Sequence, residues 1–178
     1  MRSLSLTSHP TTPCPHVRAV NVRVDPASEH ELALHYRVEG DLDELRWPAP
    51  RASAHTDGLW QHTCFEAFVK HGDARAYFEL NFSPSSEWAI YGFEDYRHGR
   101  KPRKPRHPPE ITAERQGDEL LEVAVTVHLE GLLTEQPRRD RLRLSLAAVL
   151  EDRRGALSYW AVAHPSERPD FHHADSFI

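Results

Sequence analysis

The stretch that decides the fold is residues 77–97, "YFELNFSPSSEWAIYGFEDYR". Its first six residues alternate in a period of two, which is typical of a β-strand because neighbouring side chains there point to opposite faces. The two faces of this strand carry Phe78, Leu80 and Phe82 on one side, and Tyr77, Glu79 and Asn81 on the other. A carboxylate between two apolar neighbours needs a partner, so we ask what Glu79 faces.

The same period of two recurs along the chain and predicts further strands. They are expected at about residues 17–24, 32–38, 59–70, 76–82, 88–93, 111–115, 121–127, 142–150 and 156–163. Turn residues in "QGD" (116–118) and "DRRG" (152–155) predict hairpins. One short helical piece is expected at residues 129–135. Many short strands with minimal helix predict an all-β fold, an antiparallel β-sandwich of the immunoglobulin or jelly-roll kind.

The length of 178 residues fits one domain. We expect it to span residues 17–178, after a flexible N-terminal tail at residues 1–16. The net charge of −5 argues against general nucleic-acid binding, which needs a basic excess. No apolar run resembles a signal peptide or a membrane span, and there are only two cysteines. We therefore expect a cytoplasmic protein without a membrane partner.

Two carboxylates form the first candidate for chemistry. Glu66 lies on the strand before Glu79, and the connection "HGDAR" (71–75) is short enough for antiparallel pairing. If the two carboxylates are neighbours, they repel each other, so the pair needs a cation, a shared proton or hydrogen-bond donors such as sugar hydroxyls. The alternative is an exposed pair, or one matched by nearby arginines.

Aromatic residues form the second candidate. A sugar ring has apolar faces that stack on aromatic planes while its hydroxyls bind polar groups. Trp60 and Trp88 lie close in sequence to Glu66 and Glu79, and Arg97 follows them. For each tryptophan, packing in the core is the alternative.

The C-terminal segment "AHPSERPDFHHADSFI" and a basic segment are weaker candidates. His164, His172 and Asp175 are of the types that bind metals, but their spacing matches no known ligand pattern. The alternative is a segment that closes one end of the sandwich. The Pro-rich residues 97–109, "RHGRKPRKPRHPP", predict a solvated loop, with a local anion contact as the alternative.

Three blocks, "DGLWQHTCFEAFV" (57–69), residues 77–97 and "WAVAHPSERPDFHHADSF" (160–177), together resemble the DOMON-like superfamily, which includes family 9 carbohydrate-binding modules. The resemblance implies an antiparallel β-sandwich that binds a sugar or a haem in a pocket. The residues that match the strand motifs are Trp60, Glu66, Glu79, Asn81 and Trp88. Those that match the closing segment are His164, Phe171 and His172.

The chain departs from the haem-binding relatives in one respect. They use methionine with histidine as axial ligands, and the only methionine here is Met1. A bis-histidine haem site remains an alternative. No cofactor is therefore expected, with haem or a metal ion as the less favoured outcome.

These patterns predict a binding module for a small, carbohydrate-like molecule, without catalytic activity. Its predicted ligand-binding residues are Trp60 and Trp88 for stacking, Glu66, Glu79 and Asn81 for hydroxyl groups, and Arg97 as a charged clamp. The alternatives are a glycoside-acting enzyme that uses Glu66 and Glu79, a haem- or metal-binding protein, and a scaffold that binds a protein partner. The sequence leaves the oligomeric state open.

Overall fold

A computed structural model describes residues 2–28, 31–132 and 141–178. These residues form eleven strands and three short 3₁₀ turns, and no α-helix occurs among them. The strands are β1 (Arg2–Ser8), β2 (Val17–Ser28), β3 (Glu31–Gly40), β4 (Cys64–His71), β5 (Tyr77–Phe82), β6 (Trp88–Phe93), β7 (Lys101–Pro102), β8 (Glu110–Gln116), β9 (Leu120–His128), β10 (Leu142–Glu151) and β11 (Leu157–Ala161). The 3₁₀ turns are η1 (Leu42–Glu44), η2 (Leu59–Gln61) and η4 (Ala174–Ser176).

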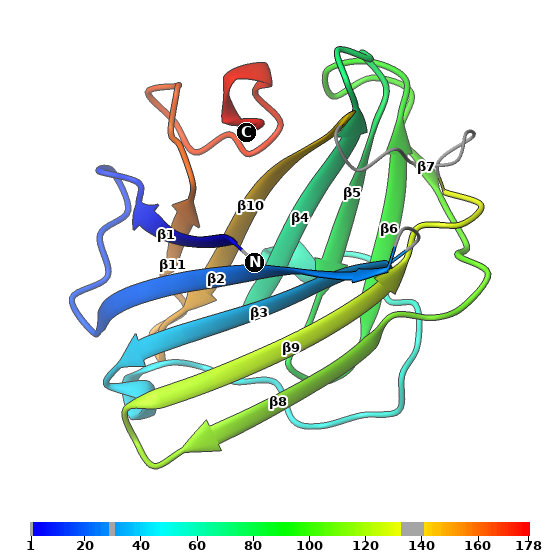
Figure 1. Cartoon of the computed structure of the whole chain (residues 1–178). Helices are drawn as coiled ribbons and strands as arrows, with labels where there is room; N and C mark the ends of the chain where they lie inside the picture. Colours follow the sequence, from blue (N-terminus) through cyan, green and yellow to red (C-terminus); the bar gives the residue numbers. More distant parts are fainter. Residues whose placement is uncertain (1, 29–30, 133–140) are drawn as a thin grey trace.

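The strands form one curled antiparallel sheet in the order β7-β6-β5-β4-β10-β11-β1-β2-β3-β9-β8. The curl produces two layers, which Figure 1 shows one behind the other. We call β1, β2, β3, β9 and β8 the first layer, and β7, β6, β5, β4, β10 and β11 the second layer. The predicted all-β antiparallel sandwich is confirmed, and both predicted hairpins, β8–β9 and β10–β11, are present.

Alternating side chains of both layers fill the space between them. The first layer contributes, for example, Leu34 and Val125, and the second contributes Phe65, Leu80 and Leu146, all fully buried. Because each strand buries every second residue here, the other half of its side chains points away from this core.

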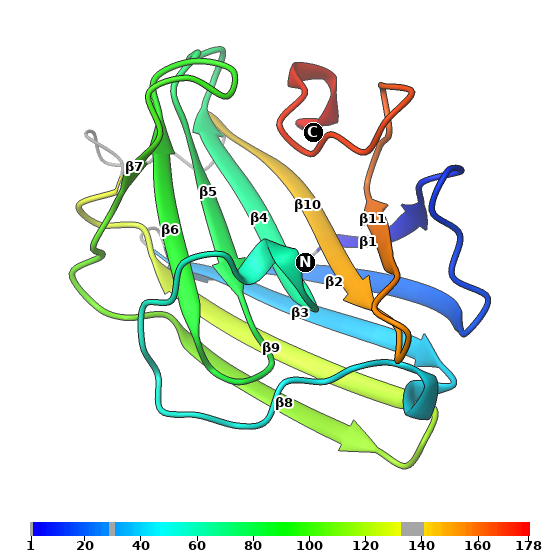
Figure 2. The same ribbon diagram turned by 180° about the vertical axis from the view of Figure 1, so that it is seen from behind.

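A second apolar cluster lies on the outer face of the second layer. It includes Phe68, Tyr91 and Val149 from the strands and Phe171 and Phe177 from the C-terminal segment. Figure 2 shows that segment, in red, beside the ends of β4, β10 and β11. The C-terminal segment therefore buries part of a sheet face that would otherwise be exposed to solvent.

The N-terminus corrects one prediction. Residues 1–16 were expected to form a flexible tail, but Arg2–Ser8 form β1, which pairs with both β2 and β11. The strand has few large apolar residues, and only Leu6 is buried. Backbone hydrogen bonds to β2 and β11 hold this strand in place. The prediction missed the strand because such bonds leave no hydrophobic pattern in the sequence.

The predicted helical piece at residues 129–135 lies partly outside the described residues, because the description stops at residue 132. The part that is described forms a β-bridge and a turn. Among the described residues, we find no helix with the length and apolar character that crossing a membrane requires.

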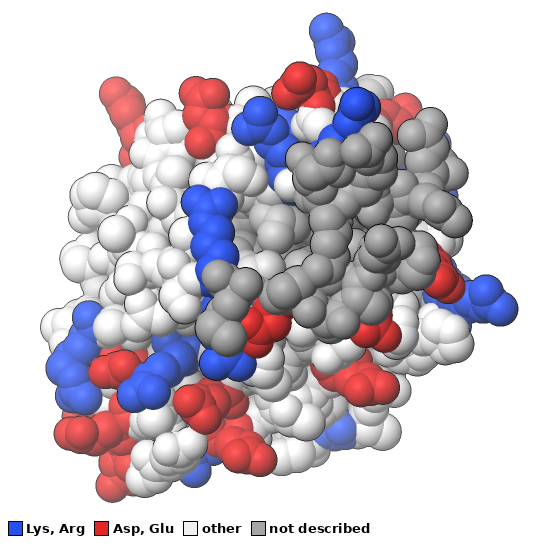
Figure 3. Space-filling view, viewed as in Figure 1, with Lys and Arg blue, Asp and Glu red and all other residues white. Residues whose placement is uncertain are grey.

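The outer face of the first layer is polar. Figure 3 shows acidic and basic side chains interspersed over this face. They include ion pairs between Arg23 and Asp25 (2.8 Å) and between Arg37 and Glu39 (2.9 Å) on β2 and β3. These side chains are partly exposed, which is typical of a solvated sheet surface.

Candidate functional site

The candidate site is a cavity of about 310 Å³ on the outer face of the second layer. The strands form its floor, while η2, the segment after β6 and the C-terminal segment form its walls. Its aromatic lining consists of Trp60, Phe93, Tyr159 and Phe171. Its polar lining consists of Glu66, Glu79, Arg97, Arg100 and His172.

The pairing of β4 with β5 brings the two glutamates together. Glu66 lies opposite Asn81, and Phe68 lies opposite Glu79, so the two glutamates are diagonal neighbours on one face. Both are buried, with exposed fractions of 3 % for Glu66 and 6 % for Glu79. The sequence left open whether the two carboxylates are neighbours, and the register of β4 and β5 places them on one face of the sheet.

Burial changes the protonation of both carboxyl groups. It raises the pKa of Glu66 well above its usual range, the negative charge of Glu79 raises this pKa further, and Arg97 opposes the shift. Burial also raises the pKa of Glu79, while the amide of Asn81 and the two arginines of the cavity lower it. The pair therefore retains a proton at a pH where an exposed glutamate has lost it.

Asn81 supports the pair from below the cavity. It is fully buried, and its side-chain amide donates a hydrogen bond to Glu79 Oε1 at 2.8 Å. Its own Oδ1 lies 3.6 Å from the thiol of Cys64. Burial raises the pKa of that thiol well above its usual range, and the charge of Glu66 raises it further, so Cys64 stays protonated.

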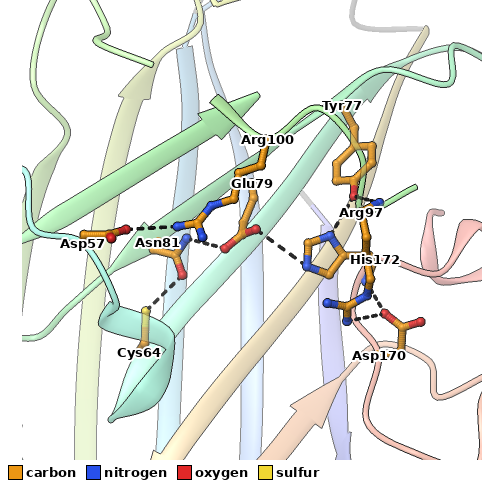
Figure 4. Close-up of polar contacts among 9 residues, drawn as sticks. All are labelled: Asp57, Cys64, Tyr77, Glu79, Asn81, Arg97, Arg100, Asp170 and His172. Carbon is orange, nitrogen blue, oxygen red and sulfur yellow. Dashed lines mark hydrogen bonds and ion pairs between the residues drawn. The ribbon is translucent and has the colours of Figure 1, made fainter. Parts of the chain in front are cut away.

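A chain of polar contacts joins Glu79 to the cavity rim, as Figure 4 shows. The ring of His172 has Nε2 at 3.6 Å from Glu79 Oε2 and Nδ1 at 2.7 Å from the hydroxyl of Tyr77. That hydroxyl accepts a hydrogen bond from the backbone N–H of Arg97 (3.1 Å), whose side chain donates to Asp170 (2.8 Å). The C-terminal segment is thus tied to β5 and to the segment after β6.

His172 is neutral at ordinary pH. Burial lowers the pKa of its imidazole to about 4, and the nearby guanidinium groups of Arg97 and Arg100 lower it in the same direction, against the effect of Asp170. Its approach to Glu79 is therefore not an ion pair. If Tyr77 donates to Nδ1, the ring carries its proton on Nε2, which faces Glu79.

A second group of contacts surrounds Arg100. Its guanidinium lies 3.9 Å from the centre of the Tyr91 ring and 4.5 Å from that of the Trp60 ring, and it donates to Asp57 at 3.0 Å. The hydroxyl of Tyr91 donates to the same carboxylate. Asp57 and Trp60, which precede β4, are held beside the cavity by these contacts (Figure 4 for Asp57 and Arg100).

The structure brings together four of the six predicted ligand-binding residues as cavity lining: Trp60, Glu66, Glu79 and Arg97. Asn81 lies beneath them. Trp88 lies elsewhere, because it points from β6 into the core between the layers, where it is 6 % exposed. The alternative expected for each tryptophan, packing in the core, is therefore correct for Trp88. Trp88 does not line the cavity.

The three weak metal candidates lie apart. His164 contacts the backbone carbonyl of Thr7 (2.8 Å), His172 lines the cavity, and Asp175 is exposed beside His173 (3.8 Å). In residues 2–28, 31–132 and 141–178, no group of three or more potential ligands is arranged to hold a metal ion. The structure thus gives no support to a shared metal site for these residues.

Sequence reasoning missed Arg100 and gave no role to Phe93, Tyr159 and Phe171. Arg100 belongs to the basic segment that was assigned to a solvated loop. The alternation of side chains could have indicated Phe93 and Tyr159. Each alternates with core residues on its strand and therefore points to the outer face of the sheet. That these faces meet at one cavity depends on the strand order, which the sequence does not give.

Comparisons with known proteins place the fold. No family model and no curated protein match the chain. A solved structure from Bacteroides uniformis, provisionally described as a carbohydrate-binding protein, is similar with a TM-score of 0.73 and 16 % identity. The match covers 99 % of this chain and 84 % of that one. At this identity the likeness shows the fold alone.

A second solved structure is a family 9 carbohydrate-binding module from Caldicellulosiruptor kristjanssonii in complex with glucose. Its TM-score is 0.49, with 9 % identity over 88 % of this chain and 73 % of the module. The Bacteroides uniformis structure by itself shows that a solved protein shares this β-sandwich. Membership of the DOMON-like superfamily stays a prediction.

Proposed function

We propose that the protein is a carbohydrate-binding module whose cavity holds a single sugar unit. One observation carries this proposal: two buried carboxylates and four aromatic rings line the same cavity. Sugars are recognised by this combination, since rings cover their apolar faces while carboxylates accept hydrogen bonds from their hydroxyls. The volume of about 310 Å³ lies at the lower end of known ligand pockets and suits a monosaccharide.

The fold supports the proposal independently of the cavity. The Bacteroides uniformis structure shares the sandwich over nearly the whole chain and is itself provisionally described as carbohydrate-binding. Sheet faces that bind ligands need side chains that project outward from a rigid layer. Here β4 and β5 supply the carboxylates from such a layer.

Isothermal titration calorimetry with a panel of mono- and disaccharides tests the proposal. We expect at least one sugar to bind, and Trp60→Ala to weaken its binding about tenfold or more through loss of a stacking surface. Glu114→Gln is the matched control, because this exposed residue lies on β8 in the other layer. If the folded protein binds no sugar of the panel, the proposal is wrong.

A glycoside-acting enzyme is the second candidate, favoured by the same pair of carboxylates. Hydrolysis of a glycosidic bond needs one protonated and one ionised carboxyl group. The raised pKa values of Glu66 and Glu79 are compatible with one shared proton. Release of nitrophenol from nitrophenyl glycosides, abolished by Glu66→Gln and by Glu79→Gln, would favour the enzyme over the binding module.

A further inference from the structure

Glu66 is the most unusual group of the cavity. It is 3 % exposed and lines the cavity, yet in the described part of the chain its carboxylate has no hydrogen-bond or ion-pair partner. Glu79 is better supported, since it accepts a hydrogen bond from Asn81 at 2.8 Å. Because its carboxylate faces the cavity and receives no hydrogen bond from the described residues, Glu66 is available to a donor that enters from the cavity.

The cations around the cavity already have partners. Arg97 pairs with Asp170 at 2.8 Å, and Arg100 pairs with Asp57 at 3.0 Å. The pKa of His172 is about 4, so its ring adds no positive charge at neutral pH. When both glutamates are ionised, four carboxylates face two guanidinium groups, and the surplus charge of the cavity is negative.

The aromatic lining also suits a cation. The guanidinium of Arg100 lies over the rings of Tyr91 (3.9 Å) and Trp60 (4.5 Å), so a cation is already accommodated at the edge of the cavity. Phe93, Tyr159 and Phe171 add further ring surface to the cavity lining. Sugar hydroxyls would supply hydrogen bonds but no positive charge to offset the repulsion between Glu66 and Glu79 when both are ionised.

We propose that the cavity selects an amino sugar, a hexosamine with a free protonated amine whose ammonium group binds between Glu66 and Glu79. This inference rests on the proposed function and names the class of sugar. An ammonium group supplies three donors and one positive charge, so it satisfies Glu66 and offsets the repulsion between the two carboxylates. The sugar ring then contacts the aromatic lining.

The repulsion between Glu66 and Glu79 is reduced in different ways in the empty and in the occupied cavity. Without ligand, a retained proton reduces the repulsion, in agreement with the raised pKa values of both glutamates. With ligand, the ammonium group replaces that proton. Binding of an amino sugar therefore releases protons to the solvent, which calorimetry detects as a heat that depends on the buffer.

The test compares glucosamine, N-acetylglucosamine and glucose by isothermal titration calorimetry at about pH 7, where a primary amine is largely protonated. Galactosamine and mannosamine are compared with their parent sugars in the same way. We expect the amino sugar to bind about tenfold or more tightly than its parent and its acetylated form, as one charge-assisted hydrogen bond allows. Glu66→Gln should remove this preference and leave binding of the parent sugar less affected, while Glu114→Gln should keep it.

The outcomes separate the two proposals. If a neutral sugar binds as tightly as its amino form, or if Glu66→Gln keeps the preference, the amino-sugar inference is wrong and the binding module stands. If no sugar binds to the folded protein, both proposals are wrong. Circular dichroism of Glu66→Gln establishes that the variant is folded before its affinities are compared.

Discussion

Glu66 is the residue through which the proposed ligand binding would affect the stability of the protein. Its carboxyl group is buried beside Glu79, and its pKa is raised mainly because burial disfavours the charged form. A buried carboxyl group of this kind lowers the free energy of unfolding of the empty protein, and a bound donor raises it again. Retaining an unmatched acid in a buried position is typical of functional sites.

This protonation predicts how the free energy of unfolding depends on pH. A carboxyl group whose pKa is higher in the folded state binds its proton more tightly there, so its contribution to stability is present below the ordinary glutamate pKa of 4.5. That contribution is lost as the pH rises through the folded pKa. Glu66→Gln should therefore be more stable than the wild type at about pH 8, and the difference should shrink at about pH 4.

Urea denaturation of both proteins at the two pH values measures this difference. Glu114→Gln serves as the control, since its exposed side chain should change neither value appreciably. A wild type that is as stable as Glu66→Gln at the higher pH would show that Glu66 has a partner in solution.

At the scale of elements, β1 joins the two layers. It pairs with β2 in the first layer through Arg2–Leu6 and with β11 in the second through Thr7 and Ser8. Because the same strand belongs to both layers, its removal exposes the edges of two others. The N-terminus is therefore a structural element of the sandwich.

The side chain of Leu6 tests the role of β1. It is 4 % exposed and belongs to the core between the layers. Leu6→Ala should lower the free energy of unfolding by about 2–5 kcal/mol, the usual effect of emptying a buried leucine site. Ser3→Ala on the exposed side of the same strand should change it by less than about 0.5 kcal/mol. Equal, small effects in thermal or urea unfolding would instead indicate a mobile tail.

The segment after β6 is an element of the cavity, although its composition suggested a solvated loop. Arg97 adopts a left-handed backbone conformation (φ 51°), and its N–H points to the hydroxyl of Tyr77. A short edge strand, β7, follows and pairs with β6. Proline at this edge breaks no ladder inside the sheet, so the segment is ordered while remaining at the rim.

At the scale of the whole molecule, segments far apart in sequence close one cavity. Trp60 precedes the second-layer strands, Arg97 and Arg100 follow β6, and His172 lies near the C-terminus. Hydrogen bonds of Tyr77 and Asp170 join the C-terminal segment to the segment after β6, and the contacts of Arg100 with Asp57 and Trp60 join the latter to the residues before β4. A ligand that contacts several of them should therefore stabilise all of them together.

Hydrogen–deuterium exchange measures this effect. With a bound sugar in excess of its Kd by about a hundredfold, linkage adds about 2.7 kcal/mol to the free energy of unfolding. We expect slower exchange in residues 97–100 and 169–173, with little local change in β8, which lies in the other layer. Protection confined to β8 and β9 would place the ligand on the opposite face.

The sequence by itself determined the local properties of this protein. Alternation of side chains predicts nearly every strand, and turn residues predict the hairpins at residues 116–118 and 152–155, because these features depend on neighbours along the chain or across one turn. The sequence could not exclude Trp88 from the site, because the residue type alone does not show whether a tryptophan packs in the core or lines a cavity.

Only the tertiary structure decided which faces meet. The pairing of β1 with β11, the position of Arg100 over Trp60 and the placement of His172 beside Glu79 join residues that belong to separate segments of the sequence. Such contacts are selected by the burial of whole sheet faces and by the satisfaction of their polar groups. They therefore follow from the energy of the complete fold, and no local pattern contains them.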